Sequence, residues 1–166
     1  MSRAFVKETD GDALADDPLP RPPRQQPCYM TLSGITALKR ELDALKEKLA
    51  EGAPDSADLT ERAALQRTRQ RIRELNAILQ GAVAVDVSRQ STTEIRFGAR
   101  VELRDQHGVT HHYQIVGEDE VVPGSGRISW ISPLGRELIG LATGDTLTWQ
   151  RGRQSLTLEV IGFEYA

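Results

Sequence analysis

The chain has little that could support a disulfide, a membrane span or an aromatic-rich core. It holds 166 residues but a single cysteine, Cys28, so no internal disulfide can form and a reducing compartment is expected. Aromatic residues make up only 5% of the chain, and any core must therefore be mainly aliphatic. No apolar run approaches the ~20 residues of a membrane-spanning helix, and the N-terminal residues lack the apolar stretch of a signal peptide. We therefore expect a cytoplasmic protein with no membrane partner.

A strong excess of charge of either sign is also missing. The formal net charge is −3 at pH 7, which provides no general attraction to nucleic acid or to anionic lipid. The three histidines, His107, His111 and His112, do not favour a metal site, because adjacent residues on a strand point to opposite faces of a sheet. The composition therefore indicates neither a generic nucleic-acid binder nor a histidine-ligated metalloprotein.

Two stretches carry apolar residues at steps of three and four, which is the spacing of paired helices. The turn between them, at residues 51–56, contains glycine and proline and cannot continue a helix. The simplest structure is an antiparallel helical hairpin with this turn exposed at its far end. The first arm is expected to start at an N-cap, Thr31 or Ser33, and to end near Ala50, and the second to span 57–80. The predicted apolar seam consists of Ile35, Leu38, Leu42, Leu45 and Leu49 on the first arm, and of Leu65, Thr68, Ile72, Leu75 and Leu79 on the second.

From residue 93 onward the apolar period changes to two, which is the period of half-buried strands. Ser132 can cap a short helix whose first position suits Pro133 and whose end suits Gly140. The predicted fold class is α+β, with an N-terminal antiparallel helical hairpin followed by an antiparallel sheet domain with one short helix. The expected strands are 97–103, 110–116, 127–131, 146–150 and 156–160. The expected parts are a flexible extension at 1–29, the hairpin at 30–82, a linker at 83–92 and the sheet domain at 93–166.

Two carboxylates, Asp58 and Glu61, follow the turn directly and lie three residues apart, on one turn of a helix. Extending the second seam back toward the turn places both at the exposed tip of the hairpin. Paired carboxylate oxygens of this kind suit a hard cation such as Mg²⁺. The same spacing is also typical of a capped helix start whose acids compensate the helix dipole. Both interpretations can hold together, because a capping geometry also fixes the carboxylates.

Basic side chains alternate along the second arm: Arg67, Arg69, Arg71 and Arg73. At about 100° per residue they divide between two faces of the helix. Either face could contact RNA phosphates or an acidic protein surface. The alternative is a solvated face with some ion pairs.

Short motifs occur along the chain in a fixed order. They are Met30-Thr31-Leu32-x-Gly34, Phe97-Gly98, His107-Gly108-Val109-Thr110-His111, Tyr113-Gln114-Ile115-Val116-Gly117, Ile131-Ser132-Pro133, Leu138-Ile139-Gly140, Gly144-Asp145 and Phe163-Glu164-Tyr165. With this set the chain resembles the Gre family of bacterial transcript cleavage and elongation factors, over residues 30–166. The ordered set is more specific than any one of its motifs.

The resemblance implies a coiled-coil hairpin joined to an FKBP-like domain, in a monomer that is not itself an enzyme. That domain would dock at the rim of the RNA polymerase secondary channel, and the hairpin would pass down the channel toward the nascent RNA 3′ end. The family's acidic tip residues carry over to Asp58 and Glu61. They would share a catalytic Mg²⁺ with the polymerase, whose own active site then cuts backtracked RNA. No cofactor of its own is expected.

Several features depart from the family pattern. At the tip, Ala57, Arg62 and Leu65 stand where the family has glycine, asparagine and tyrosine, and Arg62 adds a positive charge beside Glu61. Each arm is about one heptad short, which removes ~10 Å of reach, and the extension at 1–29 lies outside the family core. These departures leave open an alternative, a Rnk-like short-hairpin regulator that binds polymerase without stimulating cleavage. A third interpretation is a prolyl isomerase, which would need an aromatic-lined pocket that the few aromatic residues of the domain do not favour.

Overall fold

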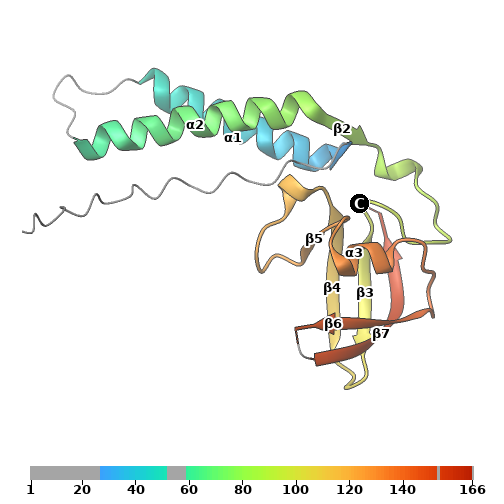
Figure 1. Ribbon diagram of the computed structural model, residues 1–166. Coiled ribbons are helices and arrows are strands. Elements are labelled where there is room, and N and C mark those ends of the chain that lie inside the picture. Colours follow the sequence, from blue (N-terminus) through green and yellow to red (C-terminus); the bar gives the residue numbers. More distant parts are fainter. Residues whose placement is uncertain (1–26, 52–58, 153, 166) are drawn as a thin grey trace, which may run out of the picture.

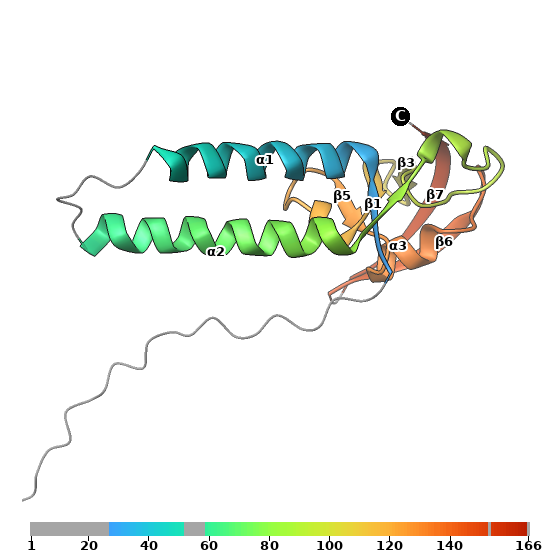
Figure 2. The same cartoon turned by 90° about the horizontal axis from the view of Figure 1, so that it is seen from above.

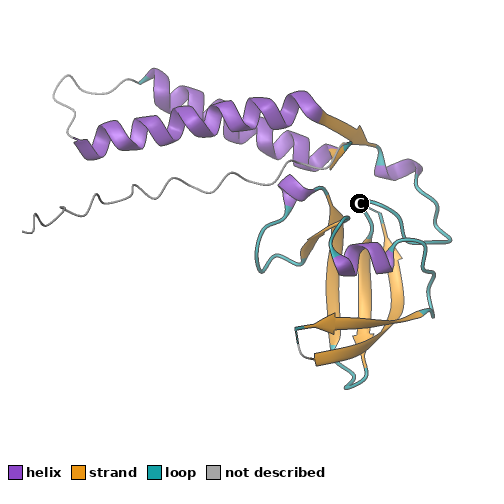
Figure 3. Ribbon diagram, in the orientation of Figure 1, coloured by secondary structure: helices purple, strands orange, loops and turns teal. Residues whose placement is uncertain are grey.

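The computed structural model describes residues 27–51, 59–152 and 154–165. In this part of the chain an antiparallel pair of helices projects to one side of a small sheet domain (Figure 1 and Figure 2). Helix α1 spans Leu32–Ala50 and helix α2 spans Leu59–Gly81. The predicted fold class, a helical hairpin followed by a sheet domain with one short helix, is confirmed (Figure 3).

The hairpin begins at the first of its two expected caps. The side-chain oxygen of Thr31 accepts a hydrogen bond of 3.0 Å from the backbone N–H of Gly34, which satisfies one of the N–H groups that a helix start leaves unpaired. Helix α1 ends at Ala50, as expected. The turn expected at 51–56 lies outside the described residues except for Glu51.

The two arms share an aliphatic core. Its buried members are Met30, Leu38, Leu42, Leu75 and Ile78, with Ile35, Leu45, Ile72, Leu79 and Ala82 partly buried around them. The predicted seam is therefore confirmed over its inner half, although Ile78 was not part of it. Leu49, Leu65 and Thr68, which lie nearer the tip, are only half-buried. Packing thus holds the hairpin mainly near the sheet domain.

Two short strands cross the base of the hairpin. Strand β1 (Cys28–Thr31) pairs in parallel with strand β2 (Ala82–Val85), with Cys28 opposite Ala82. A 3-10 helix, η1 (Val87–Arg89), follows β2. The sequence had assigned these segments largely to the extension and the linker, so ordered structure at the junction between the two parts was missed.

The sheet domain has five strands in the order β5-β4-β3-β7-β6. They are β3 (Arg100–Asp105), β4 (Thr110–Val116), β5 (Arg127–Ser129), β6 (Thr146–Arg151) and β7 (Gln154–Glu164). Strand β5 runs parallel to β4, whereas the other pairs are antiparallel. The sheet is therefore mixed and not wholly antiparallel as expected. The connection between β4 and β5 contains a second 3-10 helix, η2 (Glu118–Glu120), and brings the chain back to run in the same direction.

One short helix covers a face of this sheet (Figure 1). Helix α3 spans Pro133–Leu138, and Ser132 caps it by accepting a 3.0 Å hydrogen bond from Gly135, as the sequence predicted. The buried core between helix and sheet consists of Ile95, Ala99, Val101, Leu103, Ile115, Leu134, Leu138, Leu147, Leu158 and Val160. The sheet domain thus has a core separate from that of the hairpin. No helix in the described part of the chain is both long and apolar enough to traverse a bilayer.

Candidate functional site

Of the two metal ligands predicted at the tip of the hairpin, Glu61 belongs to the described residues. Glu61 lies in the first turn of α2 and is exposed, where the positive end of the helix dipole favours a carboxylate. Arg62 beside it is also exposed, and Leu59 at the start of the helix is 82% exposed. Asp58 lies outside the described residues, so its pairing with Glu61 stays a prediction.

The described residues contain no preformed metal cluster. Within the described ranges no group of three or more His, Cys, Asp or Glu side chains is placed to hold a metal. A carboxylate oxygen is the type of donor that Mg²⁺ prefers, and this ion needs several oxygen ligands in octahedral geometry. A Mg²⁺ shared by Asp58 and Glu61 stays a prediction.

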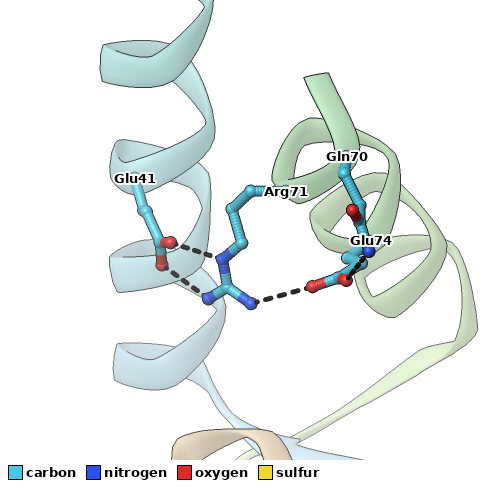
Figure 4. Close-up of polar contacts among 4 residues, drawn as sticks. All are labelled: Glu41, Gln70, Arg71 and Glu74. Carbon is cyan, nitrogen blue, oxygen red and sulfur yellow. Dashed lines mark hydrogen bonds and ion pairs between the residues drawn. The ribbon is translucent and has the colours of Figure 1, made fainter. Parts of the chain in front are cut away.

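Arg71, one of the four predicted contact residues, ties the two arms together (Figure 4). Its Nε and Nη2 atoms donate to the two carboxylate oxygens of Glu41 on α1, at 2.7 and 3.2 Å. Its Nη1 lies 3.5 Å from Glu74 on its own helix. The hydrogen bond with Glu41 is the main cause that raises the pKa of Arg71 above its usual value. Arg71 thus stabilises the hairpin in the way that the ion-pair alternative predicted.

The other three arginines remain at the surface of α2. Arg67, Arg69 and Arg73 are all exposed. They are placed where a partner could reach them, and their role as contacts to nucleic acid or polymerase stays a prediction.

His107 lies in the turn between β3 and β4, and His111 and His112 lie on β4. His111 Nε2 lies 3.0 Å from Asp105 Oδ2, and the backbone N–H groups of His107 and Val109 donate to Asp105 Oδ1 at 2.9 Å each. These hydrogen bonds, led by that of His111, hold the pKa of Asp105 below its usual value. His112 is exposed, whereas its neighbour His111 is half-buried, consistent with the opposite faces that the sequence predicted.

An apolar groove of about 330 Å³ opens on the sheet domain beside α3 and β6. Its lining includes Tyr113, Val121, Ile128, Pro133, Leu134 and Trp149. The rings of Tyr113 and Trp149 meet edge-on, with centroids 6.3 Å apart. Val121 and the adjacent Val122 are 39% and 53% exposed. Sequence reasoning missed this groove because both aromatic residues had been assigned to strands as core residues. An exposed apolar groove of this kind is typical of a protein-binding surface.

Sequence reasoning also missed Glu120, which is buried where the hairpin meets the sheet domain. It follows Glu118 and Asp119 in a short acidic run, and such a run is normally read as solvated surface. No local signal distinguishes it from its neighbours.

These features define a class of protein: a two-part chain in which a projecting helical hairpin is joined to a small sheet domain that carries an apolar groove. The family model described as "Transcription elongation factor, GreA/GreB, C-term" matches residues 90–165. The transcription elongation factor GreA of Methylococcus capsulatus is 37% identical over 153 residues, which cover 82% of this chain and 96% of that relative. GreA of Methylobacterium sp. (strain 4-46) is 34% identical, with the same coverage. The chain belongs to the GreA/GreB family of transcription elongation factors.

Solved structures of related proteins also match. The GreA factor homolog Gfh1 of Thermus thermophilus is 26% identical, with a TM-score of 0.41, and the match covers 82% of this chain and 97% of that one. A GreA/GreB factor of Nitrosomonas europaea is 21% identical, with a TM-score of 0.43 and coverage of 83% and 99%.

Proposed function

We propose that this chain binds bacterial RNA polymerase, inserts its hairpin into the secondary channel, and assists cleavage of backtracked RNA through Asp58 and Glu61. Family membership supports polymerase as the partner and the cytoplasm as the place of action. The observation that carries the tip role is the exposure of Glu61 at the free end of the hairpin. Helix α1 has 19 residues and so extends for about 28 Å, which holds the carboxylate well away from the sheet domain.

In this role the two tip carboxylates contribute oxygen ligands to a Mg²⁺ shared with the polymerase, which when bound stabilises charge that develops on the scissile phosphate. The start of α2 orients Glu61. Arg62 opposes cation binding, but in water its unit charge and the double charge of Mg²⁺ about 6 Å away repel by only about 1.4 kcal/mol. That magnitude weakens a metal site about tenfold and does not abolish it. Arg62 is therefore compatible with an active tip.

We assign polymerase docking to the apolar groove of the sheet domain. The groove combines two edge-on aromatic rings with the exposed side chain of Val121. Burying such a surface in a partner is favourable in proportion to the apolar area removed from water. The tip and the groove lie on different parts of the chain, so docking and cleavage should be separable by mutation.

The test is a cleavage assay on a backtracked elongation complex with the cognate polymerase, run together with a binding measurement. Asp58→Asn and Glu61→Gln keep size and polarity but remove the charge, and asparagine caps a helix about as well as aspartate. We expect each to abolish stimulated cleavage and to leave polymerase affinity unchanged. Glu51→Gln, which removes an exposed acid at the end of α1, is the matched control and should stay active. Arg62→Asn should raise activity at low Mg²⁺.

Three results would count against the proposal. Undiminished cleavage by both tip variants would show that the carboxylates are not ligands. A wild-type chain that binds polymerase yet stimulates no cleavage at any Mg²⁺ concentration would favour the Rnk-like short-hairpin regulator. Absence of polymerase binding would refute the function altogether.

A further inference from the structure

A buried carboxylate joins the hairpin to the sheet domain. Glu120, at the end of η2, is only 4% exposed. Its Oε2 accepts hydrogen bonds from the backbone N–H groups of Thr31, at 2.9 Å, and of Gly117, at 3.0 Å. Its Oε1 accepts from the hydroxyl of Thr31. Because Thr31 caps α1, the carboxylate also lies at the positive end of that helix. One side chain of the sheet domain is therefore bonded to the first turn of the hairpin.

Two glycines make room for this arrangement. A Cβ atom at Gly34, in the first turn of α1, would overlap the carboxylate of Glu120. A Cβ atom at Gly117 would overlap the carbonyl oxygen of Tyr29 in β1. Thr31, Gly34 and Gly117 come from two of the short motifs described above, which lie far apart in the sequence. The structure brings these three residues together at one point, and the packing there explains why each of them is present.

Apolar contacts also join the two parts, but they constrain direction less. The ring of Tyr29 lies 5.5 Å from that of Trp130 and 6.2 Å from that of Phe97, measured between centroids. Apolar association is not directional, so rings of this kind can slide with little loss. Hydrogen bonds to a buried carboxylate require defined distances and angles. The bonds of Glu120 are therefore the contacts best suited to set an angle.

The length of the hairpin makes that angle important. Helix α1 is about 28 Å long, so that a tilt of about 10° at its base moves its far end by about 5 Å. A contributed ligand must lie within about 0.5 Å of its productive position, which corresponds to about 1° at the base. Small errors at the junction are thus amplified at the tip.

We propose that Glu120 is a positioning residue, which together with Thr31, Gly34 and Gly117 fixes the direction of the hairpin relative to the sheet domain and thereby places the tip in the polymerase. The part of this proposal that concerns the tip rests on the proposed function. The part that concerns hairpin direction applies to the free chain and can be measured without polymerase.

Pulsed electron paramagnetic resonance on the full chain measures this direction. Spin labels are attached at Lys46→Cys on α1 and Val109→Cys on the β3–β4 turn, both exposed positions, in a Cys28→Ser background. Glu120→Ala removes the carboxylate, and Gly34→Ala displaces it from the hairpin side while raising the intrinsic helix propensity of α1. The matched control is Glu118→Ala, an exposed acid in the same 3-10 helix. We expect a narrow distance distribution in the parent chain and in the control, and a broadened or shifted one in both test variants, with helical circular dichroism retained.

The cleavage assay supplies the second readout. Misplacement of a catalytic group by about 1 Å can cost about 100-fold in rate, so Glu120→Ala should lose about that factor in stimulated cleavage and keep its polymerase affinity. Glu120→Gln still offers an oxygen to the two backbone N–H groups and should restore most of the activity.

Either of two results overturns the proposal: distance distributions that stay at the parental width and position in Gly34→Ala and in folded Glu120→Ala, or a broadened distribution with undiminished cleavage. If Glu120→Ala does not fold, Gly34→Ala decides the question. A wild-type chain without cleavage activity would refute the proposed function, whereas the distance measurements would still show whether Glu120 sets the hairpin direction.

Discussion

Replacing Leu75 by alanine tests whether the hairpin is an independently stabilised unit. Leu75 is 0% exposed and belongs to a small core, which has five buried residues in the described part of the chain. The substitution removes three carbons, which lose about 2.4 kcal/mol of burial at about 0.8 kcal/mol each. A cavity term is added because the neighbouring side chains relax only partly, so we expect a total loss of about 3–4 kcal/mol. For a small unit with a urea dependence of about 1 kcal/mol/M, that loss removes most of its stability.

Two signals separate the two parts of the chain in a urea titration. Helical circular dichroism reports mainly on the hairpin, since α1 and α2 have 19 and 23 residues and α3 only 6. Tryptophan fluorescence reports on the sheet domain, which contains both tryptophans, Trp130 and Trp149. In Leu75→Ala the dichroism midpoint should fall by about 3–4 M urea, and the fluorescence midpoint should change much less.

Leu59→Ala is the matched control, because it makes the same chemical change on the same helix at a position that is 82% exposed. It should leave both midpoints in place. Coincident shifts of the two signals in Leu75→Ala would refute the argument, because they would show that hairpin and sheet unfold as one unit. A loss below about 1 kcal/mol would instead show that the site collapses to fill the cavity.

Two further predictions concern the sheet domain. Val121→Asp places a charge at the apolar groove and should weaken polymerase binding at least tenfold, the equivalent of about 1.4 kcal/mol. The control is Val109→Asp, at a valine that is also exposed but lies on the β3–β4 turn, and this variant should bind normally. Equal affinities of the two variants would rule out the groove as the docking site. The pKa of Asp105 is lowered from its ordinary value of 3.8, so its stabilising effect is complete above that value and is lost as pH falls through the lower folded pKa. NMR titration should place this pKa nearer 3.8 in His111→Ala, and an unchanged pKa would contradict the assignment.

The hairpin could be predicted because the sequence pattern that specifies its two helices is local. On each arm apolar residues recur at helical spacing, such as Leu38 and Leu42 on α1 and Leu75 and Leu79 on α2. A repeat of this kind identifies the buried face of a helix without knowledge of the element that covers it. The core position that was missed on α2, Ile78, has a simple explanation. A straight helix has 3.6 residues per turn, so a strict 3.5-residue frame drifts around it. The frame selected Leu79, whereas the structure buries Ile78 more deeply.

The junction could not be predicted because its contacts are distant in the sequence. Strand β1 has four residues, and its partner β2 begins more than fifty residues later. Glu120 is buried against Thr31, at a separation of 89 residues. Periodicity describes which face of an element is apolar, and it carries no information about which distant element will cover it. The parallel pairing of β5 was missed for the same reason, since it depends on the path of the connection after β4.

The predicted shortness of the arms and the proposed role of the junction would act on the tip in opposite ways. A hairpin that is one heptad shorter loses about 10 Å of reach, but for the same tilt at its base its tip is displaced about a quarter less than that of a 38 Å arm. On the proposed function, reach would be recovered by how deeply the sheet domain binds its partner, whereas Glu120 would hold the direction. The proposals therefore assign depth, direction and chemistry to different residues: Val121 and its groove, Glu120, and the tip acids. Substitutions at the groove, at Glu120 and at the tip should change three different measurements: affinity, interdomain distance, and cleavage at constant affinity. These measurements together distinguish a short hairpin that is well directed from one that is too short to reach the active site.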